Sequence, residues 1–383
     1  RRLAAPGMLV AWGVFLAVLL LAAAWAPYGS ANGLKEAWRW STAWLAWLIA
    51  ANETRRPWHM AVVLAGVLAG PLANALLGLA QFWSGDGPPT FRIASGLRFV
   101  RASGTFGQPN SFAGYMNHAW PLALAMATGV SVHAARLARG RRMGALALAA
   151  GLWSVAALLM GALGASFSRG AWLGAMCGLL AMIVAAGGWA RRLGLALVLA
   201  ALVALALGAT SLLPAPVSAR LASITSAMAI FDPSTATVTP ATFAAVERMA
   251  QIWAGWRMWL AHPMLGVGPG NFSLAYPDMA VTPWFVSRGH AHNEPLHMAA
   301  EAGLLGLSAY LALLGAAIRQ ALRALRMAQG MLWWVALGNC GIIAAVIGHS
   351  MFENLHVLHL TLHLAAVWGI CASIAARSQP HTT

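Results

Sequence analysis

Residues 8–26 read MLVAWGVFLAVLLLAAAWA, an uninterrupted apolar run that decides the fold. As an α-helix, this run is long enough to cross a hydrocarbon core of about 30 Å. Transmembrane β-strands would instead alternate polar and apolar residues over about ten positions. The sequence therefore predicts an all-α polytopic membrane protein. Ten apolar runs are expected to span the membrane: 8–26, 37–52, 58–80, 109–132, 144–165, 170–188, 193–213, 300–318, 328–348 and 357–376.

The composition excludes a soluble globular protein. Of 383 residues, 60% are hydrophobic and 9% are charged, whereas about a quarter of the residues in a soluble domain are charged. Mean hydropathy is +0.70. The net charge of +15 comes from basic residues in short loops between apolar runs, so it indicates membrane topology and not a nucleic-acid partner. Cys177, Cys340 and Cys371 lie inside predicted helices without paired spacing, so neither a disulfide framework nor a zinc site is expected.

Basic residues are distributed unevenly between the two sides of the predicted bundle. With a cytoplasmic N-terminus, fourteen of the 24 Lys and Arg residues fall on the cytoplasmic side, where Glu53 is the single acidic residue. The positive-inside rule therefore predicts that both termini are cytoplasmic. These fourteen are Arg1, Arg2, Arg55, Arg56, Arg136, Arg139, Arg141, Arg142, Arg191, Arg192, Arg319, Arg323, Arg326 and Arg377.

Two long polar segments lie on the opposite, outer side. Residues 81–110 are rich in Gly, Pro, Ser and Arg, and residues 214–299 are too polar to span a membrane. Loops of this length are usually functional or disordered. Within the second, FAAVERMAQIWAGWRMWLA (243–261) predicts an amphipathic helix lying on the membrane. Its broad apolar face comprises Val246, Met249, Ile252, Trp253, Trp256, Trp259 and Leu260.

These segments give three expected regions within one integral membrane domain. Residues 1–213 form an N-terminal transmembrane bundle, 214–299 a loop region with the amphipathic helix, and 300–383 the C-terminal transmembrane helices.

The outer segments contain four polar motifs. Residues 101–115 read RASGTFGQPNSFAGY, and residues 166–170 read SFSRG. Glu247-Arg248 precedes HPMLGVGPGNF (262–272), and after Arg288 the chain reads HAHNEPLHMAAEAGLLG (290–306). In that last motif Asn293 is suited to cap a helix whose first turn holds Pro295.

Together these motifs resemble the O-antigen ligase family, within the superfamily of O-antigen ligases, O-antigen polymerases and O-linked oligosaccharyltransferases. The resemblance rests on R-x-S-G-T-F-x-x-P-N, S-x-S-R-G, E-R before H-P-x-x-G-x-G-x-x-N-F, and H-x-H-N-E-x-L with E-x-G-L-L-G. It implies a GT-C-like glycosyltransferase that takes a glycan from undecaprenyl diphosphate on the periplasmic side of the bacterial inner membrane. Because the family usually has about twelve spans, we expect about 10–12 transmembrane helices and a large, partly helical periplasmic loop.

The resemblance also assigns roles to individual residues. Arg169 and Arg248 match the functional arginines of the superfamily and are expected to bind the diphosphate, for which a planar guanidinium is suited. Arg101 and Arg288 are lesser candidates. His292 matches the functional histidine, and an imidazole can take the proton of an attacking hydroxyl. His290 and Glu301 are expected near the substrate.

Each assignment has a structural alternative. Arg169 can lie at a helix end with its charge at the interface, and Arg248 can be a solvated surface charge. Glu301 can bind a hydroxyl, support His292 or cap backbone. A metal site at His290 and His292 is disfavoured because the spacing fixes no third ligand, so no metal and no cofactor is expected. A cavity lining and plain packing remain equal alternatives for His349, Glu353, His356, His359 and His363.

The expected function is O-antigen ligase activity in lipopolysaccharide biosynthesis. The donor is an undecaprenyl diphosphate-linked glycan, the acceptor is a sugar hydroxyl of lipid A-core, and membrane lipids surround the protein. The first alternative is an O-antigen polymerase, or an O-linked oligosaccharyltransferase with a protein acceptor. A membrane transporter is less favoured, because no two related halves are apparent in the sequence.

Overall fold

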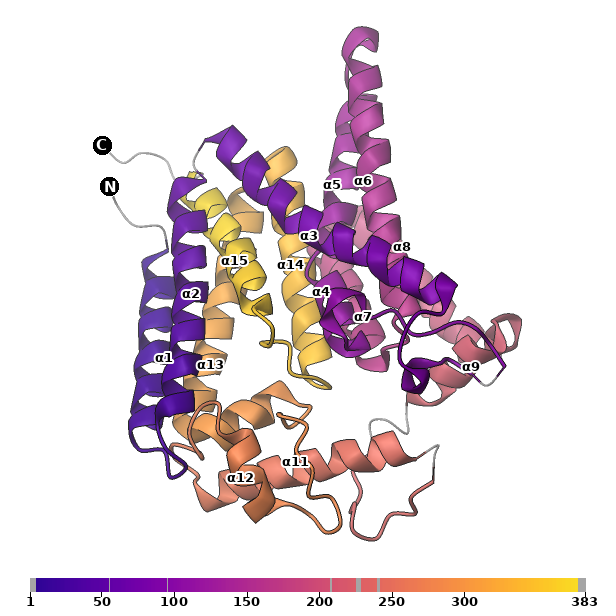
Figure 1. Ribbon diagram of the computed structural model, residues 1–383. Coiled ribbons are helices and arrows are strands. Elements are labelled where there is room, and N and C mark those ends of the chain that lie inside the picture. Colours follow the sequence, from indigo (N-terminus) through magenta and orange to yellow (C-terminus); the bar gives the residue numbers. More distant parts are fainter. Residues whose placement is uncertain are drawn as a thin grey trace. The chain divides into compact units, whose positions relative to one another are not determined.

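The computed structural model describes residues 5–54, 56–94, 96–206, 209–224, 229–239 and 242–377 (Figure 1). Over these ranges the protein is all-α, and the two β-bridges found there are isolated. Arg1, Arg2 and Arg55, which we counted as cytoplasmic charges, lie outside the described residues. The α-helices are α1 (Pro6–Ala24), α2 (Ala31–Glu53), α3 (Pro57–Ser84), α4 (Pro109–Asn117), α5 (Trp120–Ala135), α6 (Arg139–Ala165), α7 (Arg169–Ala186), α8 (Gly188–Ala206), α9 (Ala215–Ala222), α11 (Phe243–Ala261), α12 (Phe272–Met279), α13 (Glu294–Met327), α14 (Met331–Ser350) and α15 (Leu360–Arg377).

Seven described helices are long and apolar enough to cross a membrane: α1, α3, α6, α7, α13, α14 and α15. They confirm the predicted class, an all-α polytopic membrane protein. The other three predicted spans correspond to α2, to α4 with α5, and to α8. α8 ends at Ala206, and residues 207 and 208 of the predicted span 193–213 lie outside the described residues. The total of 10–12 spans and the cytoplasmic position of both termini stay predictions.

The prediction of one continuous span over 109–132 is wrong, because the helix breaks between Asn117 and Trp120. Pro121 has no backbone N–H, and in a continuous helix its ring would clash with the carbonyl of Asn117. The Asn117 side chain forms two hydrogen bonds at this break. Its Nδ2 donates to the Ala171 carbonyl at 3.1 Å, and its Oδ1 accepts from Trp120 Nε1 at 2.9 Å.

The chain forms two compact units that each combine distant parts of the sequence. Unit 1 comprises Arg1–Ile49, Thr225–Gln320 and Ser350–Ala366, and unit 2 comprises Ala50–Ile224, Ala321–His349 and Val367–Thr383. The expected division into 1–213, 214–299 and 300–383 stays a prediction.

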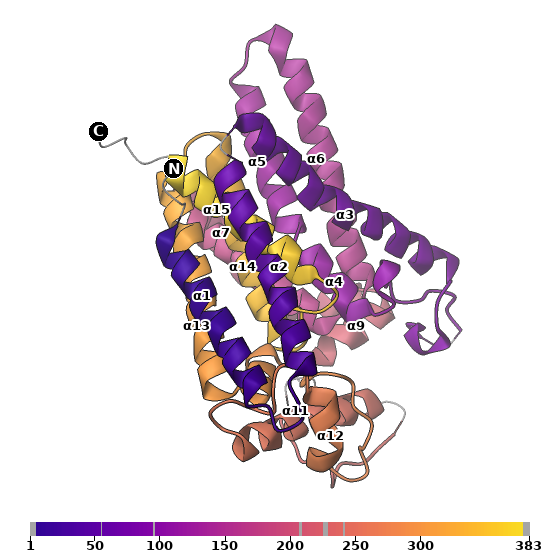
Figure 2. The same ribbon diagram turned by 60° about the vertical axis from the view of Figure 1, so that its left-hand side comes forward.

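Within unit 1, α1, α2 and the first part of α13 run side by side, with α11 and α12 at one end of this bundle (Figures 1 and 2). Hydrogen bonds tie α12 to the turn between α1 and α2. Tyr28 donates to Asp278 Oδ2 at 2.7 Å, and Asn271 Nδ2 donates to the Gly29 carbonyl at 2.9 Å. The α12 segment is therefore held against the N-terminal helices.

Within unit 2, α5 and α6 pack along each other as a long hairpin (Figure 1). α3 also packs against α6, and the short α4 contacts α3, α6 and α7. Pro57 begins α3 at a position where its missing N–H costs nothing, and Gly85 ends it in the left-handed conformation, with φ of 81°.

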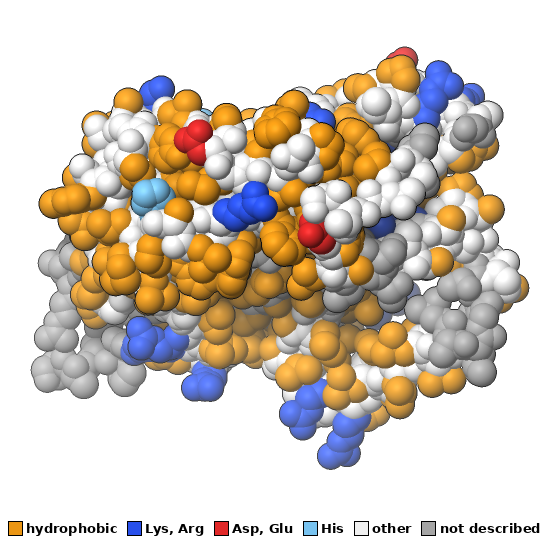
Figure 3. All heavy atoms as spheres, turned by 90° about the horizontal axis from the view of Figure 1, so that it is seen from below, with side chains coloured by type: hydrophobic (Ala, Val, Ile, Leu, Met, Phe, Trp, Pro, Cys, Tyr) orange, Lys and Arg blue, Asp and Glu red, His pale blue; other side chains and the backbone are white. Residues whose placement is uncertain are grey.

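The predicted amphipathic helix forms as α11 over the expected residues, but its apolar residues divide between two environments. Val246, Met249 and Met258 are buried in unit 1. Trp256 and Leu260 remain 46% and 63% exposed. The surface that bears α11 and α12 is shown in Figure 3. Two residues of the predicted membrane-binding face, Val246 and Met249, are therefore core, and the exposed part is narrower than the sequence suggested.

Candidate functional site

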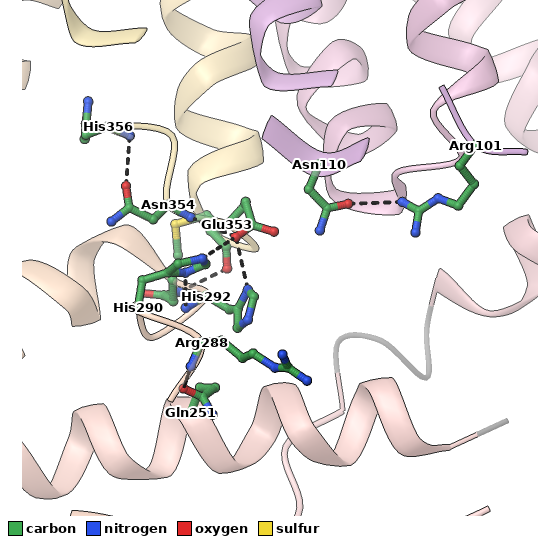
Figure 4. Close-up of polar contacts among 11 residues, drawn as sticks. Arg101, Asn110, Gln251, Arg288, His290, His292, Glu353, Asn354 and His356 are labelled. Atoms are coloured by element: carbon green, nitrogen blue, oxygen red, sulfur yellow. Dashed lines mark hydrogen bonds and ion pairs between the residues drawn. The ribbon is translucent and has the colours of Figure 1, made fainter. Parts of the chain in front are cut away.

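Two histidine side chains of unit 1 converge on one carboxylate oxygen, that of Glu353. Glu353 lies buried in the loop between α14 and α15. Its Oε1 is 3.0 Å from His292 Nδ1 and 3.2 Å from His290 Nε2. Figure 4 shows both imidazole rings turned toward this carboxylate. The structure therefore brings together the two histidines of the H-x-H-N-E motif and adds an acidic partner.

The protonation of this cluster follows from its surroundings. Burial opposes ionisation of Glu353, but His292, His290 and Arg248 hold the pKa of this carboxyl well below its usual range. Burial lowers the pKa of His290 to about 4, which leaves its ring neutral at pH 7. Because an ionised carboxylate only accepts hydrogen bonds, His292 donates through Nδ1 and His290 through Nε2. His290 Nδ1 in turn accepts the backbone N–H of His292 at 3.2 Å.

A neutral imidazole with its proton on Nδ1 presents a lone pair at Nε2. Within the described ranges, His292 Nε2 has no hydrogen-bond partner, whereas Nδ1 is held by Glu353. A carboxylate that fixes the tautomer of a histidine in this way prepares the opposite nitrogen to act as a general base. His292 is therefore arranged to accept a proton from a hydroxyl group.

The backbone around His292 also fixes the direction of the ring. His292 has φ of 52°, in the left-handed region that residues other than glycine seldom adopt. The next residue, Asn293, caps α13 as predicted, because its Oδ1 accepts the N–H of Leu296 at 2.9 Å. Its Nδ2 donates to the Met351 carbonyl at 3.1 Å. Asn293 thus links the loop that carries His292 to the loop that carries Glu353.

Arg248 extends from α11 and is half-buried. Its positive charge contributes to the lowered pKa of both His290 and Glu353, so it lies within electrostatic reach of the cluster. Its Nε is buried and has no hydrogen-bond partner in the described part of the chain. Leaving such a donor unpaired costs about 1–3 kcal/mol. A bound anion would supply the missing acceptor.

Arg288, a predicted diphosphate ligand, is committed to another contact. Its Nε and Nη2 lie 2.8 Å and 2.5 Å from Glu247 Oε1, and its backbone N–H donates to Gln251 Oε1 at 2.9 Å. Gln251 is fully buried and also donates to Tyr276 Oη at 2.8 Å. Both contacts attach the segment before His290 to α11. The geometry therefore favours a positioning role for Arg288.

Glu301 likewise holds backbone. Its Oε2 accepts the N–H of Gly270 at 2.7 Å, and its Oε1 accepts the N–H of Phe272 at 3.0 Å. Of the alternatives that the sequence left open for Glu301, the backbone-capping role agrees best with these contacts. The glutamate of E-x-G-L-L-G thereby anchors the H-P-x-x-G-x-G-x-x-N-F loop.

Two glycines allow this loop to lie directly against α13. Gly303 interrupts α13 with φ of 65°, and a Cβ there would lie 2.2 Å from the Met264 carbonyl carbon. A Cβ on Gly266 would lie 2.3 Å from the Glu301 carbonyl carbon. Neither position has room for a side chain. The glycine spacing of the two motifs is therefore a requirement of backbone packing beside the histidine cluster.

In unit 2 the structure joins the first two motifs. Arg101 Nε donates to the Ser166 carbonyl at 2.8 Å, and Arg101 Nη2 donates to Asn110 Oδ1 at 3.2 Å (Figure 4). Arg169 is the first residue of α7, and its Nη1 donates to the Ser223 carbonyl at 2.8 Å. Both arginines are half-buried. Arg101 therefore contacts the S-x-S-R-G turn, to which Arg169 itself belongs.

The predicted site residues thus fall into two groups. Unit 1 holds His290, His292, Arg248, Arg288 and Glu301, and unit 2 holds Arg101 and Arg169. Sequence reasoning missed the role of Glu353, for which a buried acid between apolar helices was the available signal. It also missed Arg220, whose Nε donates to the Phe167 carbonyl at 2.9 Å and which belongs to none of the four motifs.

The histidine cluster also has the composition of a metal site. One ligand atom from each of His290, His292 and Glu353 lies within 4.8 Å of the others, and zinc takes such ligands. The hydrogen bonds to Glu353 account for the same geometry without an ion. Operation without a metal therefore stays a prediction.

Comparison with known proteins adds one finding. The family model described as O-antigen ligase matches residues 153–311, a range that holds α7, α11 and the start of α13. No curated protein matches the chain significantly. The matched range contains Arg169, Arg248 and His292. This part of the chain is therefore similar to the O-antigen ligase family, whose members are glycosyltransferase-like enzymes.

Proposed function

We propose that the protein is an O-antigen ligase of the bacterial inner membrane. It transfers O-antigen polysaccharide from undecaprenyl diphosphate to a sugar hydroxyl of lipid A-core, at a site that faces the periplasm. The observation that carries this proposal is His292, with its tautomer set by Glu353 and with Arg248 in electrostatic reach. The family match supports the ligase and polymerase type of chemistry.

His292 acts as the general base of this transfer. Its Nε2 accepts the proton of the acceptor hydroxyl while the oxygen attacks the anomeric carbon of the donor glycan. The bond between that carbon and the diphosphate oxygen breaks, and the electron pair leaves with undecaprenyl diphosphate. Glu353 stabilises the imidazolium that forms, through the 3.0 Å contact with Nδ1. Base catalysis of this kind contributes about 10²–10⁴-fold to a rate.

The leaving diphosphate gains negative charge and needs preorganised cations. Arg248 is suited to this role because its buried Nε has no partner within the described residues. Arg169, with Arg101 as a lesser candidate, is proposed to bind the donor on the strength of the motif matches. Arg288 and Glu301 are assigned to positioning. Arg288 is hydrogen-bonded to Glu247, and Glu301 accepts the backbone N–H groups of Gly270 and Phe272.

The acceptor is tested directly with purified full-length protein and an undecaprenyl diphosphate-linked glycan. Lipid A-core, a second molecule of lipid-linked glycan and a pilin-like protein are offered in separate reactions. Glycosylated lipid A-core with release of undecaprenyl diphosphate is the expected result. Chain extension would identify a polymerase, and protein glycosylation an oligosaccharyltransferase. Failure with all three acceptors, by protein shown to be folded, would contradict the proposed transfer.

A further inference from the structure

The histidine cluster has a second chemical capability, because its three side chains present the ligand atoms that zinc prefers. The sequence disfavoured a metal at His290 and His292 because their spacing fixed no third ligand. The structure supplies that ligand, Glu353, from the loop between α14 and α15 (Figure 4). Two histidines and one glutamate form one of the ligand sets of three-ligand zinc sites, in which the fourth position stays open.

The separations between these atoms are close to those around a tetrahedral zinc ion. Zinc lies about 2.0–2.2 Å from its nitrogen and oxygen ligands, so two ligands of a tetrahedral ion are about 3.3–3.5 Å apart. Glu353 Oε1 lies 3.0 Å from His292 Nδ1 and 3.2 Å from His290 Nε2. One ligand atom from each of the three residues lies within 4.8 Å of the others. Both separations from the carboxylate therefore need little change to admit an ion.

The burial of the three side chains suits a cation that enters from outside. The Glu353 side chain is 5% exposed, whereas those of His290 and His292 are 19% and 16% exposed. A buried carboxylate attracts a cation more strongly than one in water, because the surroundings screen its charge less. The partly exposed imidazoles leave a route by which an ion can reach that carboxylate.

Coordination would reverse the tautomer on which the proposed transfer depends. In the metal-free cluster His292 carries its hydrogen on Nδ1 and keeps a lone pair at Nε2. A neutral imidazole that binds a metal through Nδ1 carries its hydrogen on Nε2 instead. Zinc takes the place of the Nδ1 proton, and that proton moves to Nε2. The nitrogen assigned to accept the hydroxyl proton thereby becomes a donor.

Two features of the cluster weaken the site without removing it. Coordination through Nε2 places the hydrogen of His290 on Nδ1, so the 3.2 Å hydrogen bond from the His292 backbone N–H is lost. The positive charge of Arg248 also lies within electrostatic reach and opposes a cation. Both effects favour an ion that binds reversibly over one that is a permanent part of the protein.

We propose that His290, His292 and Glu353 bind Zn²⁺ reversibly, and that the bound ion inhibits glycan transfer by occupying the base. Binding of the ion rests on the ligand geometry alone, whereas its inhibitory effect rests on the proposed function. Mg²⁺ and Ca²⁺ prefer oxygen ligands, so a site with two imidazoles discriminates against them. The transfer itself needs no metal in this account.

The experiment uses purified full-length protein, freed of metal with a chelator that is then removed. His290→Gln and Glu353→Gln each remove one ligand, and His133→Gln is the control because His133 is exposed in α5. Equilibrium dialysis against Zn²⁺ or Mg²⁺, followed by metal analysis, measures the bound ions, and Tm reports folding. Glycan transfer and donor binding by the unaltered protein and His133→Gln are then measured with increasing Zn²⁺, before and after addition of chelator.

We expect the unaltered protein and His133→Gln to differ by one bound Zn²⁺ or less, and to share a saturable site that Mg²⁺ does not fill. His290→Gln and Glu353→Gln should each weaken this site at least about tenfold, since the loss of a residue outside the coordination shell already costs about 10–100-fold. Zn²⁺ should abolish transfer at the concentration that fills the site, with donor affinity within about twofold, and chelator should restore transfer.

Undiminished zinc binding by either folded variant would overturn the inference, as would the absence of a saturable site in the unaltered protein. Because each variant is decisive alone, the test survives if the other fails to fold. Full transfer with the site filled would overturn the inhibitory effect. The metal-free transfer assay tests the proposed function separately. Zinc bound at the cluster of a folded protein that, without zinc, glycosylates no acceptor contradicts the proposed function and leaves the zinc site supported.

Discussion

Replacing Glu353 with Gln probes the tautomer argument without changing the size of the side chain. The buried carboxylate accepts a hydrogen bond from His292 Nδ1 at 3.0 Å and another from His290 Nε2 at 3.2 Å. A hydrogen bond to a charged group is worth about 1.5–3 kcal/mol. Since each 1.4 kcal/mol is a factor of ten, loss of the charge beside a developing imidazolium costs about 10- to 150-fold.

The amide of Gln also brings an N–H donor that favours the opposite tautomer of His292, and a wrongly oriented catalytic histidine can cost about 10⁴-fold. We therefore expect kcat of Glu353→Gln to fall by about 10²–10⁴-fold, with little change in the KM for the lipid-linked donor. Asp278→Asn is the matched control, because Asp278 accepts its hydrogen bond from Tyr28 outside the cluster. Steady-state kinetics with purified protein measure both variants. A kcat within threefold of the unaltered enzyme in Glu353→Gln would refute the reasoning.

The arginine and metal assignments give further expectations. Arg248→Ala should strongly reduce turnover while Tm stays nearly unchanged. Arg248→Lys should restore little of the turnover, because a point charge lacks the bidentate geometry of a guanidinium. Full activity of both variants in a transfer assay would make Arg248 a surface residue. Activity should survive excess chelator, and complete loss restored by Mg²⁺ or Mn²⁺ would show that a metal is required. Because the pKa of His290 falls to about 4 on burial, the unfolded chain binds an additional proton between about pH 6.5 and pH 4, so the stability that this group contributes should be full above that window and should be lost across it as the pH falls. His290→Gln should lessen this acid-induced fall in Tm, and an identical pH profile would count against a buried neutral ring. Glu301→Ala should lower Tm, because the backbone N–H groups of Gly270 and Phe272 lose their acceptor at a cost of about 1–3 kcal/mol of stability each. An unchanged Tm would contradict the backbone-capping role of Glu301.

The class of the fold could be predicted because it depends on the lengths of apolar runs. A continuous run such as 8–26 has few alternatives to a membrane-spanning helix. The break at 118–119 escaped prediction because hydropathy averages over the whole of 109–132, whereas one proline decides whether the helix continues. The burial of Val246 and Met249 was not predicted for a related reason, since periodicity identifies an apolar face of a helix without indicating what covers that face.

Local contacts of the candidate site could be predicted where the residues are close in sequence. His292 and Asn293, the N-cap of α13, lie in one motif, and the spacing of this motif indicated that a histidine precedes the start of a helix. Glu353 follows His292 by 61 residues, and no local pattern reports a contact of that separation. The sequence alone did not indicate the partners of Arg288 and Glu301, which are Glu247 and the backbone of the glycine loop, because these contacts form only in three dimensions.

The most direct test of the account compares His292→Ala with the unaltered protein in two parallel measurements, glycan transfer and binding of the lipid-linked donor. Because His292 is assigned to the acceptor proton and the arginines to the diphosphate, transfer should fall by about 10²–10⁴-fold while donor affinity stays within about twofold. The loss should be largest where the unaltered enzyme is fastest, so the rise of activity with pH should flatten in the variant. Transfer at the level of the unaltered protein would remove His292 from the mechanism, and a matching loss of donor affinity would show that it binds phosphate instead of accepting a proton.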